Sequence, residues 1–254
     1  LGERDDERIY GRGTTDMKGA VAAMAQVALA YACTETEPPV TLQFAFVSDE
    51  ETGGDAGLTT LLETTEFSPA ACVVGETTSR NGRYSVSVAD RGNIWLTIEA
   101  SGTAAHGSRP MIGENAIDRL VAAVDQLRGE FGERELAVDA AMDEIIAESI
   151  GFYEPEAGAE ATRQLYRYPT INLGIIEGGT AINTVPASAT AEVDVRLTAS
   201  VDTGEVLRSI RGCFDGLDGV EITDVSRTRG SYEPLDGAIV EATAAAAGRV
   251  VDDR

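Results

Sequence analysis

Histidine and lysine are almost absent from this sequence. Its 254 residues include one histidine, His106, and one lysine, Lys18, so the other basic side chains are arginines. A single histidine excludes a metal centre that draws several imidazole ligands from this chain. The 20 basic side chains are also outnumbered by 43 acidic ones, which leaves a net charge of −23 at pH 7. Such a charge repels polyanions, so neither a nucleic acid nor an anionic membrane surface is an expected partner.

Cysteines and long apolar runs are scarce as well. The three cysteines, Cys33, Cys72 and Cys213, are widely spaced and form no CxxC motif. This pattern argues against a disulfide framework and favours a reducing compartment. No apolar run approaches the length of a membrane span, and no signal-peptide core opens the sequence. We therefore expect a cytoplasmic protein.

The excess of acidic residues is a surface property and not a sign of disorder, because 43% of the residues are hydrophobic and can supply a core. High acidity with almost no lysine is typical of halophiles that accumulate salt, in which molar salt screens the self-repulsion. A GC-rich genome that favours arginine codons is the alternative explanation. We favour the halophilic one.

Residues 1–82 show the alternation of an α/β sheet. A strand is expected to end at Ile9 and Tyr10, and apolar side chains at helical spacing follow Asp16. The apolar segments 40–47 and 71–75 resemble buried strands, and a short helix is expected between them at 55–63. This order predicts one part of an α/β domain.

Residues 83–228 follow a different pattern. Strands are predicted at 94–99, 170–176, 189–197 and 220–225, and helices at 115–127 and 201–213. The order strand, helix, strand, strand, helix, strand is that of a ferredoxin-like α+β domain. An acidic, partly helical insertion occupies 129–168. Residues 229–254 contain an alanine-rich helix that we expect to return to the first domain, which would make 83–228 an inserted domain.

Acidic side chains follow the predicted strands of the first domain. They are Asp16, the run Asp49-Glu50-Glu51, and Glu76. Ligands bind at the carboxyl ends of strands in open α/β sheets, and carboxylates that converge there repel one another unless a cation lies among them. Of two adjacent glutamates, one can bind a metal while the other accepts a proton from metal-bound water, whose pKa falls to about 7. Any single one of these acids could equally be a solvated surface charge.

Five sequence motifs occur in an order known from one family. They are GRGTTDMKG at 11–19, SDEETGG at 48–54, VGE at 74–76, GTAAHGSRP at 102–110 with GENAI at 113–117, and GGTAINTVP at 178–186 with DVR at 194–196. Together they resemble motifs of the co-catalytic zinc amidohydrolases and peptidases, which include acetylornithine deacetylase, succinyl-diaminopimelate desuccinylase, aminoacylase and glutamate carboxypeptidase. The resemblance implies a zinc-peptidase-like α/β catalytic domain with an inserted ferredoxin-like (βαββαβ) α+β domain that acts as a lid and dimerisation domain.

The resemblance implies a role for each acidic motif. Asp16 would bridge two divalent metal ions, Glu51 would bind one of them, and Glu76 would bind the other. The ions would be zinc, with cobalt or manganese as alternatives. Glu50 would be the general base that activates the bridging water and later protonates the leaving amine. The reaction would be hydrolysis of an amide through a tetrahedral intermediate.

Three residues of the inserted domain have implied roles too. His106 would donate a hydrogen bond to the substrate carbonyl or oxyanion, often in the site of the partner subunit, so activity would require a homodimer. Arg196 would bind a substrate carboxylate, for which guanidinium geometry is suited, and Asn183 would orient the substrate. From the residues alone, His106 could be an incidental loop residue, Asn183 a turn residue, and Arg196 part of a surface ion-pair ladder.

Two features of the family are missing from this sequence. The family has an upstream His-x-Asp motif and a further histidine near its C-terminus, whereas the only histidine here falls in the lid motif. An all-carboxylate set suits hard ions better than zinc. Because the sequence opens at Leu1 without methionine, we expect a segment of a longer enzyme. The alternative is a truncated relative that serves as a non-catalytic dimerising or binding module.

The expected activity is metal-dependent hydrolysis of an N-acyl amino acid or small peptide with a free carboxylate, as in the deacetylase and desuccinylase of amino-acid biosynthesis. A magnesium- or manganese-dependent phosphoryl-transfer enzyme could use the same carboxylates. Against that alternative, the loop at 11–19 lacks the GxxxxGK[ST] spacing of a P-loop, and few cationic groups surround it.

Overall fold

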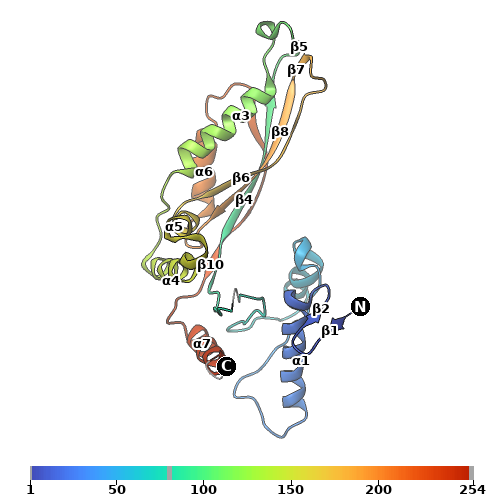
Figure 1. Ribbon diagram of the computed structural model, residues 1–254, viewed down its shortest axis with the longest axis vertical. Coiled ribbons are helices and arrows are strands. Elements are labelled where there is room, and N and C mark those ends of the chain that lie inside the picture. Colours follow the sequence, from blue (N-terminus) through green and yellow to red (C-terminus); the bar gives the residue numbers. More distant parts are fainter. Residues whose placement is uncertain (1, 79–81, 252–254) are drawn as a thin grey trace. The chain divides into compact units, whose positions relative to one another are not determined.

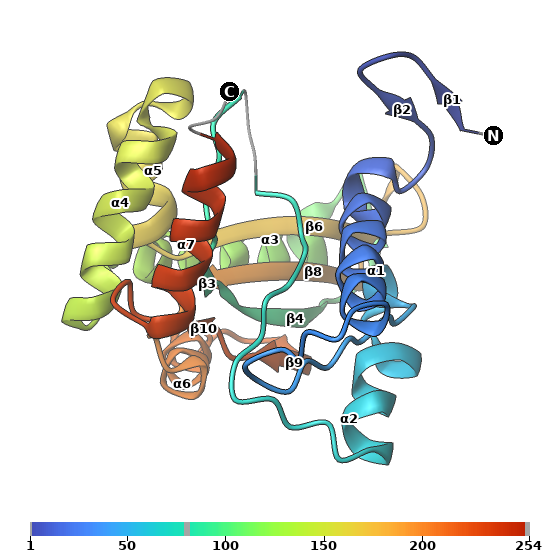
Figure 2. The same cartoon turned by 90° about the horizontal axis from the view of Figure 1, so that it is seen from below.

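The computed structural model describes residues 2–78 and 82–251, which divide into two units, Leu1–Val86 and Ser87–Arg254. The second unit is built on a four-stranded antiparallel sheet of β4 (Gly92–Ser101), β6 (Thr170–Gly178), β8 (Ser188–Leu197) and β9 (Val220–Thr228). The strands lie in the order β6-β8-β4-β9 (Figure 2). Helices α3 (Ala116–Leu127) and α6 (Thr203–Cys213) cover one face of this sheet (Figure 1). The βαββαβ order predicted for residues 83–228 is thereby confirmed.

Apolar side chains at strand and helix spacing hold this sheet and its helices together. Ile94, Leu96 and Ile98 of β4 are buried on the face that meets the helices, and the alternating residues of β8 from Ala189 to Leu197 are buried with them. The helices add a buried stripe to the same core, which includes Leu120 of α3 and Ile210 of α6. Each large aliphatic side chain buried in this way stabilises the fold by about 1.5–3 kcal/mol.

Both helices begin at a capping residue that the sequence supplies. The Asn115 side chain accepts hydrogen bonds from the backbone N–H groups of Ile117 (2.9 Å) and Asp118 (3.3 Å) at the start of α3. The Asp202 carboxylate does the same for α6, with donors at 2.7 and 2.9 Å. These bonds satisfy N–H groups that have no partner inside a helix, so they fix where each helix begins.

The remainder of the second unit consists of the predicted insertion and several short elements. They are β3 (Ala89–Asp90), β5 (Ala105–His106), η4 (Pro110–Ile112), η5 (Arg128–Gly132), α4 (Ala140–Ala157), α5 (Ala159–Arg167), β7 (Thr184–Val185), β10 (Ser231–Tyr232) and α7 (Ala238–Val251). A small second core forms around Met142 and Ile146 of α4. Strand β10 pairs with β3, and α7 belongs to the residues of the second unit. The return of residues 229–254 to the first domain therefore stays a prediction.

The first unit contains short elements joined by loops. They are β1 (Glu3–Arg4), β2 (Ile9–Tyr10), η1 (Thr14–Lys18), α1 (Gly19–Ala32), η2 (Glu50–Thr52), η3 (Asp55–Thr59) and α2 (Thr60–Thr64). The predicted helices after Asp16 and at 55–63 are confirmed. The strand expected to end at Tyr10 is present as β2, which pairs only with β1.

Two strands predicted in the first unit are wrong. Residues 40–47 and 71–75 take no strand conformation, and their apolar side chains are exposed, with Val40 63%, Phe46 51% and Val74 71% accessible. A strand needs a neighbour to satisfy its backbone N–H and C=O groups. Within residues 2–78 and 82–251 these segments pair with no other strand, so apolar composition alone does not make them strands.

No helix in the described part of the chain is long and apolar enough to cross a membrane.

Candidate functional site

Asp16 lies in a tight loop at the entrance to α1. The backbone at Asp16 and Met17 is not helical, although η1 surrounds them, and the peptide bond between the two residues is cis. The loop is closed by Lys18, whose backbone N–H donates to the Gly13 carbonyl (2.8 Å) and whose Nζ donates to the Arg12 carbonyl (3.2 Å). These two hydrogen bonds of Lys18 therefore stabilise the loop that carries Asp16.

The acidic run that begins at Asp49 divides into one structural residue and two exposed ones. Asp49 has a left-handed backbone (φ 74°), and its carboxylate accepts hydrogen bonds from the Thr52 hydroxyl and from the Ala56 backbone N–H (3.1 Å). These two hydrogen bonds lower the pKa of Asp49, with the Thr52 bond as the larger cause. Asp49 thus ties the turn to the next helix, while Glu50 and Glu51 extend into solvent.

One cavity brings two of the predicted metal ligands together. It has a volume of about 710 Å³ and is lined by residues 11–16, Lys18 and Glu51. Asp16 and Glu51 come from loops that are far apart in the sequence, so folding of the first unit has placed their carboxylates around one space. Neither Glu50 nor Glu76 lines this cavity.

Glu76 is carried by a segment that packs directly against α1. A side chain at Gly75 would meet Ala20 at 2.6 Å and Met24 at 2.8 Å, so only glycine permits this approach. The Glu76 carboxylate accepts a hydrogen bond from the Thr77 backbone N–H (3.1 Å). The structure therefore holds Glu76 beside the helix that follows Asp16, although Glu76 is exposed.

These carboxylates do not complete a two-ion site. Among the residues that the structure describes, no three His, Cys, Asp or Glu side chains lie close enough together to hold a metal ion. A zinc ion takes three or four protein ligands, and Asp16 with Glu51 supply only two around their cavity. The donor set suits a divalent cation chemically but accounts for only part of the predicted centre.

His106 lies on β5, at the end of the second unit opposite β10 (Figure 1), where it pairs with Thr184 of β7. Its Nδ1 accepts a hydrogen bond from the Ser108 backbone N–H (3.2 Å) and lies 2.8 Å from the Ser108 hydroxyl. Because a backbone N–H can only donate, the neutral ring carries its proton on Nε2. This tautomer presents a donor, as the predicted role of His106 requires.

Asn183 lies next to His106 in the structure. The Gly107 backbone N–H donates to the Asn183 carbonyl (2.7 Å), and a Cβ at Gly107 would come within 2.9 Å of Asn183 backbone atoms. The sequence placed these two residues in separate motifs, and the fold brings their segments into contact.

Arg196 is not part of this cluster. It lies near the C-terminal end of β8, whereas Asn183 precedes the start of that strand. At about 3.3 Å per residue, the eight steps from Ser188 to Arg196 span about 26 Å. The Arg196 Nε donates a hydrogen bond to Asp194 Oδ2 (2.9 Å). This contact is also an ion pair of the kind predicted for the polar face of the strand.

Sequence reasoning missed the supporting roles of Asp49, Asp194 and Trp95. Asp49 could have been recognised from the turn signal in SDEETGG, since Asp and Gly favour left-handed backbone. The link between Trp95 and Asp194 had no sequence signal, because the two residues lie on different strands.

Comparisons with known proteins give the chain its family. Residues 88–218 match the model of the peptidase dimerisation domain. A probable carboxypeptidase of Neosartorya fischeri is 31% identical over 230 residues, which cover 87% of this chain and 46% of that protein. A probable carboxypeptidase of Aspergillus terreus is 32% identical over 238 residues, covering 91% of this chain and 49% of that protein. The chain thus spans about half the length of the curated relatives it matches.

Solved structures share the fold. A tripeptidase from Staphylococcus aureus matches with a TM-score of 0.65 at 20% identity, covering 98% of this chain and 60% of its own. Human carnosine dipeptidase 1 matches with a TM-score of 0.63 at 20% identity, with the same coverage. These matches bear out the predicted α/β fold with a lid domain. The model of the peptidase dimerisation domain matches just over half of the residues of this chain. The chain therefore belongs to the M20 family of metallopeptidases.

Proposed function

We propose that the whole protein is a metal-dependent hydrolase that cleaves an amide bond in a small peptide or an N-acyl amino acid with a free carboxylate. The observation that carries this proposal is the shared cavity of Asp16 and Glu51, which lies beside the loop of Glu50. Membership of a metallopeptidase family supports the same reaction class and argues against phosphoryl transfer.

The residues of this chain would divide the chemistry among them. A bound divalent ion supplies Lewis acidity for the amide carbonyl. The Glu50 side chain is exposed and has no hydrogen-bond partner among the described residues, so its carboxylate is free to accept a proton from the attacking water and return it to the leaving amine. The Nε2–H of His106 would stabilise the oxyanion.

The lid residues support a site shared by two subunits. His106 and Asn183 lie beyond one end of β8 and Arg196 near the other, so a single copy of the second unit does not bring all three to one substrate. We propose a homodimer through the dimerisation domain, in which His106 and Asn183 of one protomer serve the site of its partner. Arg196 would bind the substrate carboxylate.

Several finer features belong to the same proposal. The metal would be zinc, with cobalt or manganese as alternatives, and the substrate would be of the acetylornithine or succinyl-diaminopimelate type. The three cysteines are free, which supports a reducing cytoplasmic location. The acidic surface would be an adaptation to high salt, which screens the repulsion among its charges.

The test is a complementation experiment on the full-length protein with its metal. Glu50→Gln should lower kcat by about two to four orders of magnitude at unchanged metal content, because it removes the general base. His106→Ala should lower kcat by about two to three orders of magnitude, again without loss of metal. When the two variants are mixed and allowed to exchange subunits, roughly a quarter of the wild-type activity should return, since half of the dimers are mixed and each has one intact site.

Glu63→Gln on α2 is the matched control and should leave kcat unchanged. Failure of the mixture to regain activity would place His106 in its own protomer's site. Loss of metal from His106→Ala would make His106 a ligand. A wild-type protein that hydrolyses no amide substrate with any of the three metals would favour the non-catalytic dimerising module instead.

A further inference from the structure

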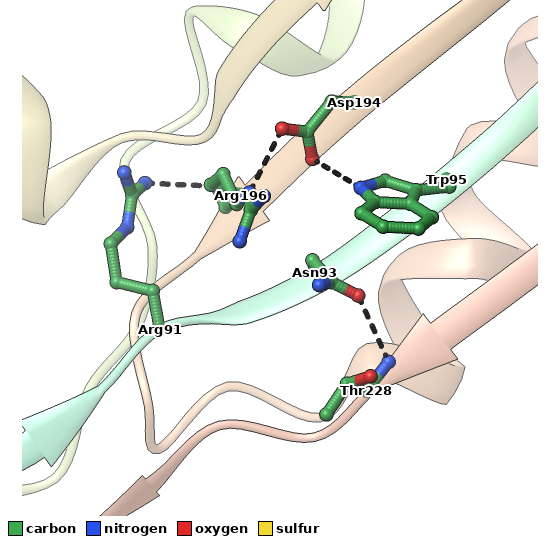
Figure 3. Close-up of polar contacts among 6 residues, drawn as sticks. All are labelled: Arg91, Asn93, Trp95, Asp194, Arg196 and Thr228. Carbon is green, nitrogen blue, oxygen red and sulfur yellow. Dashed lines mark hydrogen bonds and ion pairs between the residues drawn. The ribbon is translucent and has the colours of Figure 1, made fainter. Parts of the chain in front are cut away.

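Arg196 lies on the face of the four-stranded sheet that α3 and α6 do not cover. Its neighbours along β8, Val195 and Leu197, are buried against the helices, so the Arg196 side chain projects from the opposite face. On that face Asp194 precedes it on β8, and Trp95 of β4 lies directly across from Asp194. Figure 3 shows these three side chains in a row, with Asp194 between the other two.

Asp194 uses both of its carboxylate oxygens to join its neighbours. Oδ2 accepts a hydrogen bond from Arg196 Nε at 2.9 Å, and Oδ1 accepts one from Trp95 Nε1 at 3.1 Å (Figure 3). Because the indole belongs to a different strand, the second bond restrains rotation of the Asp194 carboxylate. Asp194 therefore holds the guanidinium of Arg196 at a defined angle.

The bond to Asp194 leaves the other edge of the guanidinium available. Among the described residues, Nη1 and Nη2 of Arg196 have no hydrogen-bond partner, and the side chain is 39% accessible. A guanidinium binds a carboxylate through two parallel N–H donors, and the Nη1–Nη2 pair forms such a fork. With Nε occupied by Asp194, the fork is the edge that a second carboxylate can reach.

Arg91 contacts the backbone of Arg196. Its Nη2 donates to the Arg196 carbonyl at 3.0 Å (Figure 3), and its buried Nε has no hydrogen-bond partner within residues 2–78 and 82–251. Burial lowers the pKa of Arg91, and the adjacent positive charge of Arg196 lowers it further. A second cationic group thus lies beside Arg196.

We propose that Asp194, restrained by the Trp95 indole, is a positioning residue that turns the Nη1–Nη2 edge of Arg196 toward the substrate carboxylate. This inference rests on the proposed function, because it takes Arg196 as the carboxylate-binding residue. It adds Asp194 and Trp95 as determinants of the preference for substrates with a free carboxylate.

A positioning role and a simple countercharge role predict effects of opposite sign. If Asp194 acted only as a competing negative charge, its removal would free Arg196 and strengthen the binding of a carboxylate. If Asp194 positions Arg196, its removal releases the guanidinium into several rotamers and weakens that binding. Asparagine at this position keeps the shape but offers only one acceptor oxygen, so it cannot serve both donors.

The experiment measures binding to the metal-free full-length protein, so no substrate is turned over. The probes are N-acetyl-L-alanine and its neutral amide, N-acetyl-L-alaninamide. Calorimetry gives the affinities for both probes. Asp194→Asn should weaken binding of the carboxylate about tenfold, as expected for the loss of one charge-assisted contact, and leave the amide unchanged.

Three further variants make the result decisive. Arg196→Lys should abolish the preference for the carboxylate, and adding Asp194→Asn to it should have no further effect. Trp95→Phe, followed by calorimetry, should weaken carboxylate binding by a smaller factor. Asp224→Asn, which removes a negative charge from the same face of the sheet without touching Arg196, is the control and should leave both affinities unchanged.

The outcomes separate this inference from the proposed function. Tighter or unchanged binding of the carboxylate to Asp194→Asn, with Arg196→Lys impaired, would overturn the positioning role alone. An equal loss for the carboxylate and the amide would show general damage to the sheet and also overturn it. If Arg196→Lys keeps the carboxylate preference, or the wild type shows none, then the proposed role of Arg196 fails and the inference fails with it.

Discussion

The two units of the chain are held together by different kinds of contact. In the second unit, the strands and helices enclose a continuous core of aliphatic side chains contributed from across the sequence. In the described part of the first unit, Gly57 is the only fully buried residue, and loops are closed by short-range polar bonds such as those of Asp49 and Lys18. Arg196 is therefore placed by a well-packed sheet, whereas the acidic loops are placed by local hydrogen bonds.

This difference explains where the site is well defined. Arg196 lies on β8, whose register with β4 is set by cross-strand pairs along the whole strand, whereas His106 lies on the short strand β5, which pairs with β7 only at Ala105 and His106. The carboxylates of Asp16 and Glu51 lie on loops whose neighbouring apolar segments, at 40–47 and 71–75, are exposed. The polypeptide thus combines a well-packed sheet, which carries Arg196, with solvent-exposed loops, which carry Asp16 and Glu51.

The largest expected effect contrasts a core residue of one unit with an exposed apolar residue of the other. Leu96→Ala should lower the free energy of unfolding by about 2–5 kcal/mol, because it leaves a cavity beneath α3 and α6. Phe46→Ala removes a larger side chain but should change stability by no more than about 0.5 kcal/mol, since that side chain is exposed. Calorimetric unfolding of both variants is the measurement. Equal losses would mean that Phe46 is buried and that the contrast between the units is false.

A smaller effect is expected at the start of α3. Asn115→Ala should cost about 1 kcal/mol, because two backbone N–H groups lose their acceptor. Asn115→Asp keeps the acceptor and should stay close to the wild type. Trp95 is the only tryptophan among these 254 residues, so urea denaturation of this polypeptide followed by tryptophan fluorescence reports on the second unit. A loss in the aspartate variant as large as in the alanine one would show that the cap is not the cause.

The smallest effect is a dependence of stability on pH. Backbone hydrogen bonds from Glu205 and Gly204 lower the pKa of Asp202 below its usual value in the folded protein. A lowered folded pKa means that the cap stabilises the protein above the unfolded pKa of about 3.9 and loses this effect as the pH falls through the folded value. The melting temperature should therefore fall with acidification below about pH 4.

Two asparagine variants sharpen that measurement. Asp202→Asn keeps an acceptor at the cap but does not titrate, so its melting temperature should fall less steeply in acid. Asp49 also has a lowered pKa. Because almost none of the described residues of the first unit are buried, we expect that unit to contribute little to the unfolding transition, and Asp49→Asn to leave the slope unchanged. A steeper slope for Asp202→Asn, or a changed one for Asp49→Asn, would contradict this account.

Much of the second unit follows from its sequence pattern. The alternation from Ala189 to Leu197 predicted β8, and the helical stripe after Asn115 predicted α3, because these patterns fit burial on one face. The same reasoning failed at 40–47 and 71–75. Strand formation there depends on partner strands, which composition does not reveal.

The candidate site, too, was predicted only in part from the sequence. The motifs pointed to Asp16, Glu51 and His106, and the structure placed the first two around one cavity. Which acid of the run at 49–51 is structural was not visible in the motif. It depends on the Ala56 N–H that Asp49 meets after the turn.

The sequence by itself determined the family motifs, the acidic surface, and the strands and helices whose apolar periodicity is strong. Only the tertiary structure decided that Asp49 and Asp194 support their neighbours, that His106 Nδ1 accepts a hydrogen bond from the Ser108 backbone N–H, and that Asn183 lies beside His106 while Arg196 does not. The reason is physical. Periodicity depends on residues a few positions apart, whereas hydrogen-bond partners and site geometry depend on which distant segments the fold brings together.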